Sequence, residues 1–139
     1  MDMTRIVSLT VGVIGLAWVI GLGAANSQQA PPTTTKGLTE KRLAGINLSQ
    51  EFDSVQGREF RMRLVTIEPG GVIAVHSHRD RPALTYILQG TLTEYRDGVA
   101  TEYRMGETIK PETKEVTHWV ENKGATPVVA IVVDIPKQP

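Results

Sequence analysis

The residues of this sequence that are best suited to chemistry are its three histidines, His76, His78 and His118. Side chains at positions i and i+2 of a β-strand project from the same face, so His76 and His78 would hold their rings side by side. A third imidazole from a neighbouring strand would complete a facial set of metal ligands, and His118 is the sole candidate. For one histidine alone, a surface or hydrogen-bonded core position is the ordinary interpretation. The confinement of all three to two short stretches favours a metal site.

Composition narrows the chemistry further. The chain has no cysteine, which excludes thiolate ligands, disulfides and cysteine nucleophiles. Its 15 basic residues balance its 15 acidic ones, so no basic face is expected and nucleic acid is not a predicted partner. A length of 139 residues suits one domain with a core of its own. Any metal must therefore be held by imidazole, carboxylate or backbone oxygen.

The first 25 residues have the layout of a secretory signal peptide. Arg5 precedes an uncharged apolar run over residues 6–25, and small and polar residues follow it. The run is also long enough to form an apolar helix that spans a bilayer, so a retained signal anchor is the alternative. Residues 26–37 then indicate a linker. Either interpretation predicts an exported domain, in a bacterial periplasm or anchored in the inner membrane, with membrane contact only through residues 6–25.

The elements that must position the histidines are short strands. Over residues 38–139 apolar or alternating runs recur between turn signals about every ten residues, which predicts eight or nine strands in an all-β barrel or jelly roll. Residues 58–67 alternate, with Phe60, Met62 and Leu64 expected to face the core. The arginines on the other face are expected to be solvated or ion-paired, with a ligand-binding set as the alternative. A turn is predicted at residues 69–71, followed by a separate strand over 72–78.

The two histidine stretches resemble the two sequence motifs of the cupins. The first motif is matched by Gly70, His76, His78 and Gly90, and the second by Gly106, His118 and Asn122. The resemblance implies a double-stranded β-helix and places the three histidines at metal-ligand positions. Zn, Fe, Mn, Ni and Cu all suit such a site. Many cupins pair through strands at the barrel edge, so the resemblance also implies a homodimer.

The sequence departs from the cupin pattern where a glutamate ligand commonly follows the paired histidines. Ala83 occupies that position, so a metal held by histidines alone would keep more open positions and favour an anionic co-ligand. Glu112 and Glu115 are candidate substitute ligands, with a solvated loop glutamate as the ordinary interpretation of each. Thr85 and Ile87 share the Ala83 side and are predicted to line a pocket.

One further residue and a choice of function complete the prediction. Tyr86 lies on the opposite side of its strand from Ala83 and is expected to pack in the core. The leading hypothesis is an exported single-domain cupin that binds one divalent metal and a small anionic organic molecule. It acts as a metal-dependent oxygenase, isomerase or lyase, or alternatively as a non-catalytic periplasmic module that binds a small molecule or a metal. The residues do not decide between these two.

Overall fold

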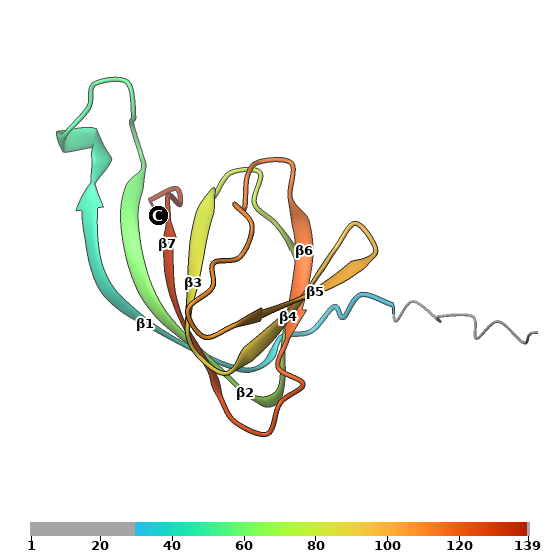
Figure 1. The fold of residues 1–139 in the computed structure, drawn as a ribbon. Helices are drawn as coiled ribbons and strands as arrows, with labels where there is room; N and C mark the ends of the chain where they lie inside the picture. The colour runs from blue at the N-terminus through green and yellow to red at the C-terminus, as the bar shows by residue number, and fades with distance from the viewer. Residues whose placement is uncertain (1–29, 139) are drawn as a thin grey trace, which may run out of the picture.

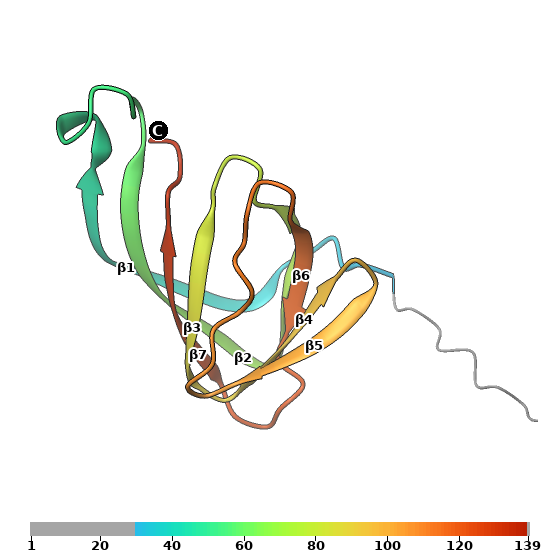
Figure 2. The same ribbon diagram turned by 45° about the horizontal axis from the view of Figure 1, so that its top comes forward.

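A computed structural model describes residues 30–138, which form one strongly curled antiparallel sheet (Figures 1 and 2). Its strands are β1 (Lys36–Asn47), β2 (Glu59–Ser77), β3 (Ala83–Gln89), β4 (Thr91–Arg96), β5 (Val99–Arg104), β6 (Thr117–Glu121) and β7 (Val128–Asp134). The strands follow the order β3-β7-β2-β6-β4-β5, and β1 pairs with β2. The short 3-10 helix η1 (Leu48–Gln50) links β1 to β2. The predicted all-β fold is confirmed.

The predicted apolar helix over residues 6–25, with its signal or anchor, lies outside the described residues. Between residues 30 and 138, no helix is long and apolar enough to cross a membrane. The start of the predicted linker also lies outside them. The part of the linker that the structure describes, from residue 30, runs along the edge of the sheet. There the backbone N–H of Val75 donates to the carbonyl of Pro32 at 3.0 Å.

Residues 30–138 form seven strands, whereas the sequence predicts eight or nine; one reason is that two of the predicted strands are a single strand. Residues 61–67 of β2 pair with β7, and residues 72–77 of the same strand pair with β6. The predicted turn at residues 69–71 is wrong: the chain bends there and the strand continues. Gly70 has a φ of 72°, and a Cβ on Gly71 would lie 2.7 Å from the carbonyl oxygen of Glu68. Glycines at the bend therefore let one strand serve both sides of the curled sheet.

The alternation in β2 is present, but the prediction of which face is buried was wrong. Arg63 is only 7% exposed and lies on the inner face with Val65 and Ile67, whereas Phe60 is 44% exposed on the outer face. The arginine face turns inward because β7 supplies a buried carboxylate, Asp134, which accepts hydrogen bonds from both Arg61 and Arg63. An ion-paired face was among the predicted alternatives, and it is the one that the structure has.

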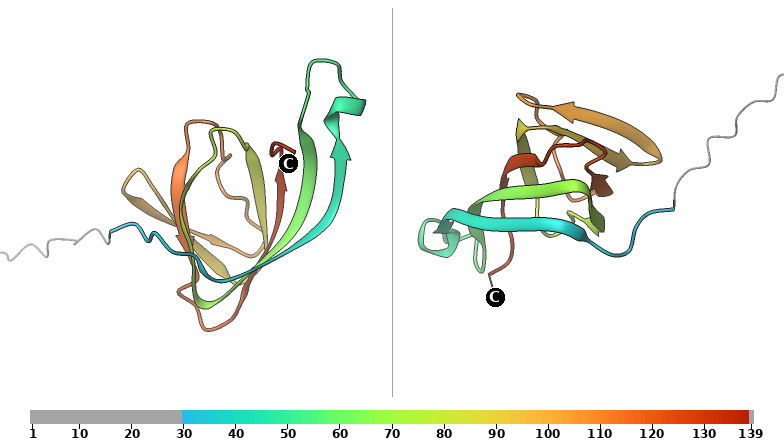
Figure 3. Two further views of the ribbon diagram at one scale, coloured as in Figure 1. Left: turned by 180° about the vertical axis from the view of Figure 1, so that it is seen from behind. Right: turned by 90° about the horizontal axis from the view of Figure 1, so that it is seen from below.

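The outer surface of the sheet carries an apolar face that the sequence assigned to the core. Tyr86 is 43% exposed, so its predicted core packing is wrong. Register places apolar side chains in rows across three strands: Met62, Val133 and Leu84 form one row, and Leu64, Ile131 and Tyr86 form the next. We call these six residues the outer apolar face. Seen from behind and from below, β1 runs along β2, and together they project as a two-stranded ribbon beyond the rest of the sheet (Figure 3).

The core fills the inside of the curl and leaves a cavity toward its mouth. Its buried members come from the inner faces of β2, β3, β4, β6 and β7 and include Val65, Ile87, Leu92, Val120 and Val128. The dipeptide Asp97-Gly98 is the strongest short hairpin signal in the sequence. The hairpin is confirmed by β4 and β5, with positive φ at both turn residues. This hairpin matters for the site because β4 also pairs with β6, the strand that carries His118.

Candidate metal centre

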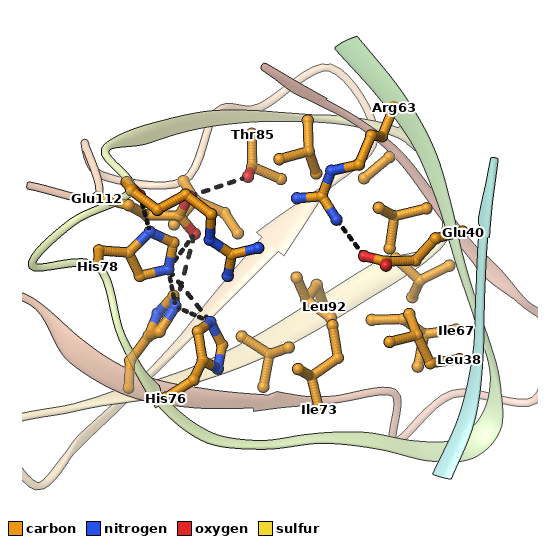
Figure 4. A pocket seen from close by; sticks show the side chains of 18 residues that line it. Leu38, Glu40, Arg63, Ile67, Ile73, His76, His78, Thr85, Leu92 and Glu112 are labelled. Carbon is orange, nitrogen blue, oxygen red and sulfur yellow. Dashed lines mark hydrogen bonds and ion pairs between the residues drawn. The ribbon is translucent and has the colours of Figure 1, made fainter. Parts of the chain in front are cut away.

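The structure brings the three histidines together at one end of the cavity (Figure 4). His76 of β2 and His118 of β6 are register partners in the antiparallel pair, and His78 follows at the end of β2. The Nε2 atoms of His76 and His78 are 3.1 Å apart, those of His78 and His118 are 3.0 Å apart, and those of His118 and His76 are 3.1 Å apart. Three ring nitrogens therefore converge on one point.

The other ring nitrogen of each histidine fixes which atom carries the proton. Nδ1 of His76 lies 2.8 Å from the carbonyl oxygen of Ala74, and Nδ1 of His78 lies 2.9 Å from that of Arg81. Nδ1 of His118 lies 2.5 Å from a carboxylate oxygen of Glu94. Each Nδ1 donates to an oxygen, so in the neutral ring each Nε2 presents only a lone pair. Lone pairs that face one another do not bond, and this arrangement needs a cation between them.

The spacing fits a single metal ion. Ligand nitrogens about 2.1 Å from one metal, at roughly right angles to one another, lie about 3 Å apart. The three Nε2 separations match that value. Oxygen acceptors behind metal-binding imidazoles are also the usual means of orienting them. The residues present therefore fit a divalent transition metal.

Burial lowers the pKa of two of these histidines, His76 and His78. Desolvation lowers the pKa of His78 to about 4, and the nearby His118, His76 and Arg81 add to the effect. Burial also lowers the pKa of His76, and the same kind of repulsion from His118 assists. A histidine that resists protonation keeps its lone pair available for a metal well below neutral pH.

A buried carboxylate faces the three histidines. Glu112 is only 5% exposed, so the interpretation of this residue as a solvated loop glutamate is wrong. Its Oε1 lies 3.6 Å from Nε2 of His118 and 4.0 Å from Nε2 of His78, while its Oε2 accepts a hydrogen bond from Thr85 at 3.3 Å. Burial raises its pKa. Glu112 is therefore placed to join the histidines as a ligand.

Of the other site residues that the sequence predicted, one lines the cavity beside the histidines and the rest do not. Glu115 is exposed and bonds to Thr113 and Lys114, away from the histidines. Ala83, Thr85 and Ile87 all face inward, but only Thr85 lines the cavity beside the histidines. Ala83 is the backbone partner of Glu112, and Ile87 is fully buried in the core.

Glu94 is the site residue that sequence reasoning missed. It is 1% exposed, and besides His118 it accepts hydrogen bonds from Arg96, at 2.6 and 2.9 Å, and from Tyr103, at 3.1 Å. Burial acts to raise its pKa, but the hydrogen bonds from His118 and Arg96 outweigh burial and hold the pKa below its ordinary value. The available signal was parity: Glu94 shares a strand face with the core residue Leu92, which marks an inward charge in need of a partner.

The rest of the cavity wall is mostly apolar. Leu38, Val65, Ile67, Ile73, Leu92, Ile109, Val120, Val128, Ala130 and Val132 line it. Two guanidinium groups, of Arg63 and Arg81, and one further carboxylate, of Glu40, also reach it. The cavity volume is about 80 Å³, which corresponds to about six water molecules.

A family described as "Cupin domain" matches residues 63–134, which is more than half of the chain. The chain is a cupin. The predicted resemblance is therefore confirmed, and the curled sheet is this cupin's version of the double-stranded β-helix. No functionally curated protein matches the sequence.

Solved structures agree with the cupin fold. A Klebsiella pneumoniae protein with a double-stranded beta-helix domain aligns with a TM-score of 0.58 at 16% identity, covering 77% of this chain and 84% of that one. The polyketide cyclase RemF from Streptomyces resistomycificus aligns with a TM-score of 0.60 at 21% identity, covering 77% of this chain and 70% of its own. A conserved barrel protein from Salinispora arenicola gives 0.53 at 17% identity, covering 70% and 74%. At these identities the likeness is one of fold.

Proposed function

We propose that this cupin binds one divalent transition metal through His76, His78 and His118, with Glu112 as a fourth ligand. The observation that carries the proposal is the convergence of three Nε2 atoms whose partner Nδ1 atoms are all bonded to oxygen acceptors. Zn, Fe, Mn, Ni and Cu remain the candidate ions, because imidazole and carboxylate suit all of them.

We also propose that a small anionic organic molecule binds in the cavity beside the metal. The metal, when bound, supplies Lewis-acid polarisation of an oxygen on that molecule. The protein's own residues orient and enclose it: Arg81 contributes positive charge beside the histidines, and the apolar wall excludes water. An oxygenase, isomerase or lyase step fits this arrangement. RemF, a polyketide cyclase, is an example of such small-molecule chemistry on a similar fold.

A non-catalytic binding module is the second candidate, and one observation favours it. Of the two carboxylates that line the cavity, Glu40 is paired with Arg63 and Glu112 faces the proposed metal. The described cavity wall thus offers no carboxylate free to act as a general base. Turnover of a candidate substrate by metal-loaded protein separates the two functions.

The metal proposal is tested by elemental analysis of the purified protein. We expect roughly one metal ion per chain, and its loss in His76→Ala. Val75→Ala is the matched control, because Val75 is the neighbouring residue on β2 and is exposed on the other face. Protein that stays metal-free when expressed in several media with different metals would overturn the proposal.

We propose further that residues 1–25 direct the domain out of the cytoplasm, as a cleaved signal peptide or as an anchor in the inner membrane. The sequence layout supports this: a basic start, an apolar run and small residues after it. Cell fractionation and the mass of the mature chain test it. A full-length protein recovered from the cytoplasm would overturn it.

A homodimer is the partner that the outer apolar face supports. The six side chains of this face lie in register rows across β2, β7 and β3 and are exposed or half-buried. Such an apolar patch is typical of a protein–protein interface. A second copy of this chain offers the same face, which a two-fold interface requires. Sedimentation should show a dimer that Leu84→Glu dissociates. A monomeric wild-type protein would contradict the assignment.

A further inference from the structure

Arg63 stands at the end of the cavity away from the histidines (Figure 4). It comes from the inner face of β2, and its side chain is 9% exposed. One terminal nitrogen pairs with Glu40, and the other donates to Asp134 at 3.0 Å. The cavity therefore ends in a buried guanidinium held by one half-exposed carboxylate, Glu40, and one buried carboxylate, Asp134.

The charges around Arg63 leave an excess of positive charge, which Arg81 extends toward the histidines. Arg61, Arg63 and Arg81 all pair with the same carboxylate, the buried Asp134, at 2.9, 3.0 and 3.7 Å. Glu40 is the second negative charge, and its side chain is 45% exposed. Three guanidinium groups thus share two carboxylates, one of which is half in solvent. One more negative charge would balance the cluster.

The wall between the two ends of the cavity is apolar. Figure 4 shows Ile73 and Leu92 between the histidines and the pair formed by Arg63 and Glu40, with Ile67 and Leu38 beside Glu40. The polar Thr85 lies on another side of the cavity, where it bonds to Glu112. A molecule that spans the cavity meets polar groups at both ends and hydrocarbon in the middle.

We propose that Arg63 binds the carboxylate of a small aliphatic acid that carries a second oxygen at its other end, directed toward the histidines. Glu40 is then an internal carboxylate that occupies Arg63 until the ligand displaces it, since Glu40 is exposed and Asp134 is not. Displacement of Glu40 frees Nη1 of Arg63 to bind the incoming carboxylate by a charge-assisted hydrogen bond, while Nη2 stays bonded to Asp134. The histidine end of this assignment rests on the proposed metal site, whereas the arginine end does not.

The size of the cavity limits the ligand. A volume of about 80 Å³ limits the ligand to a small molecule. A four-carbon hydroxy acid such as 4-hydroxybutyrate is small and has the required ends. Butyrate has the carboxylate alone, and 1,4-butanediol has neutral ends alone.

Titration calorimetry of these three probes against Zn²⁺-loaded protein tests the assignment. 4-Hydroxybutyrate should bind tighter than butyrate, and 1,4-butanediol should bind weakest. Arg63→Met keeps an apolar stem and removes the charge, and should weaken the binding of both acids by about tenfold or more. Arg61→Met is the matched control: Arg61 pairs with the same Asp134 but does not line the cavity, so its loss should weaken acid binding far less than the loss of Arg63 does.

Glu40→Gln gives a second test that does not depend on a buried substitution. It frees Arg63 and should tighten acid binding severalfold. Equal affinities for 4-hydroxybutyrate and 1,4-butanediol would overturn the proposal, as would wild-type acid affinity in Arg63→Met or in Glu40→Gln. Metal content is measured in the same samples, so that failure of the metal site can be told apart from failure of the carboxylate site. If no metal binds, binding of butyrate to the metal-free protein that is lost in Arg63→Met still supports the carboxylate site.

Discussion

Ala83 and Glu112 exchange two backbone hydrogen bonds, at 3.0 and 3.1 Å. They are therefore direct partners across an antiparallel bridge, with side chains on the same side. Ala83 holds the position at which cupins commonly carry a glutamate, and the glutamate of this chain stands opposite it. The carboxylate has moved across the bridge and still faces the histidines.

Moving the carboxylate back should preserve metal binding. Glu112→Ala should lower Zn²⁺ affinity by about tenfold to a hundredfold, because a charged contact is lost. Adding Ala83→Glu to that variant should restore most of the affinity. Competition with a chelator measures both, and Glu115→Ala, on the exposed side of the same loop, is the control. Full affinity in Glu112→Ala would remove this residue from the ligand set.

Glu94 should act on the metal through His118. Glu94→Ala removes the acceptor that orients the imidazole and should lower Zn²⁺ affinity by about 10- to 100-fold. Glu121→Ala, which removes a half-buried glutamate from β6 that bonds to Tyr95, serves as the control. An equal effect of the two substitutions would show general loss of stability and no positioning role.

The metal-free protein should lose stability in mild acid. The pKa of His78 is about 4 when folded, against about 6.5 in an unfolded chain. Between these values the unfolded chain binds more protons, so stability falls as the pH drops through this range, by roughly 3 kcal/mol for His78. Burial lowers the pKa of His76, which adds to the loss, whereas the raised pKa of Glu112 acts in the opposite direction.

Urea unfolding at pH 7.0 and pH 4.5 measures this pH dependence. His78→Gln removes the titrating ring and should flatten it, which separates the contribution of His78 from that of Glu112. A stability of the wild-type metal-free protein that is the same at both pH values would contradict the expected protonation behaviour.

The bend in β2 should tolerate no side chain at Gly71. An added Cβ would meet the carbonyl oxygen of Glu68 at 2.7 Å and a methyl group of Ile67 at 2.8 Å. Gly71→Ala should therefore cost about 1–3 kcal/mol of unfolding free energy, measured by thermal or urea unfolding. Gly124→Ala meets only a side-chain oxygen, at 3.2 Å, and should cost less. Equal costs would indicate that the backbone relaxes at the bend.

Local patterns predicted what depends on local geometry. The i, i+2 rule placed His76 and His78 on one face, and the Asp97-Gly98 turn marked the β4–β5 hairpin correctly. These features are determined by residues close together in the chain. The alternation in β2 was equally visible, since it needs only the period of a strand.

Long-range partners decided the features that the sequence did not predict. Arg63 faces inward because it donates a hydrogen bond to Asp134, which lies 71 residues further along the chain. Glu112 is buried because its segment pairs with Ala83, and Glu94 reaches His118 because β4 pairs with β6. A single sequence shows none of these pairings, and each one provides the partner for a charged side chain that points inward.

One strand supplies residues at both ends of the cavity. Arg63 and His76 belong to β2, which passes from one side of the curled sheet to the other through the glycine bend. The path of this one backbone therefore sets the distance between the arginine and the histidines. A change at the bend that lengthens or shortens that path would alter which ligand length fits, without any substitution among the residues that touch it.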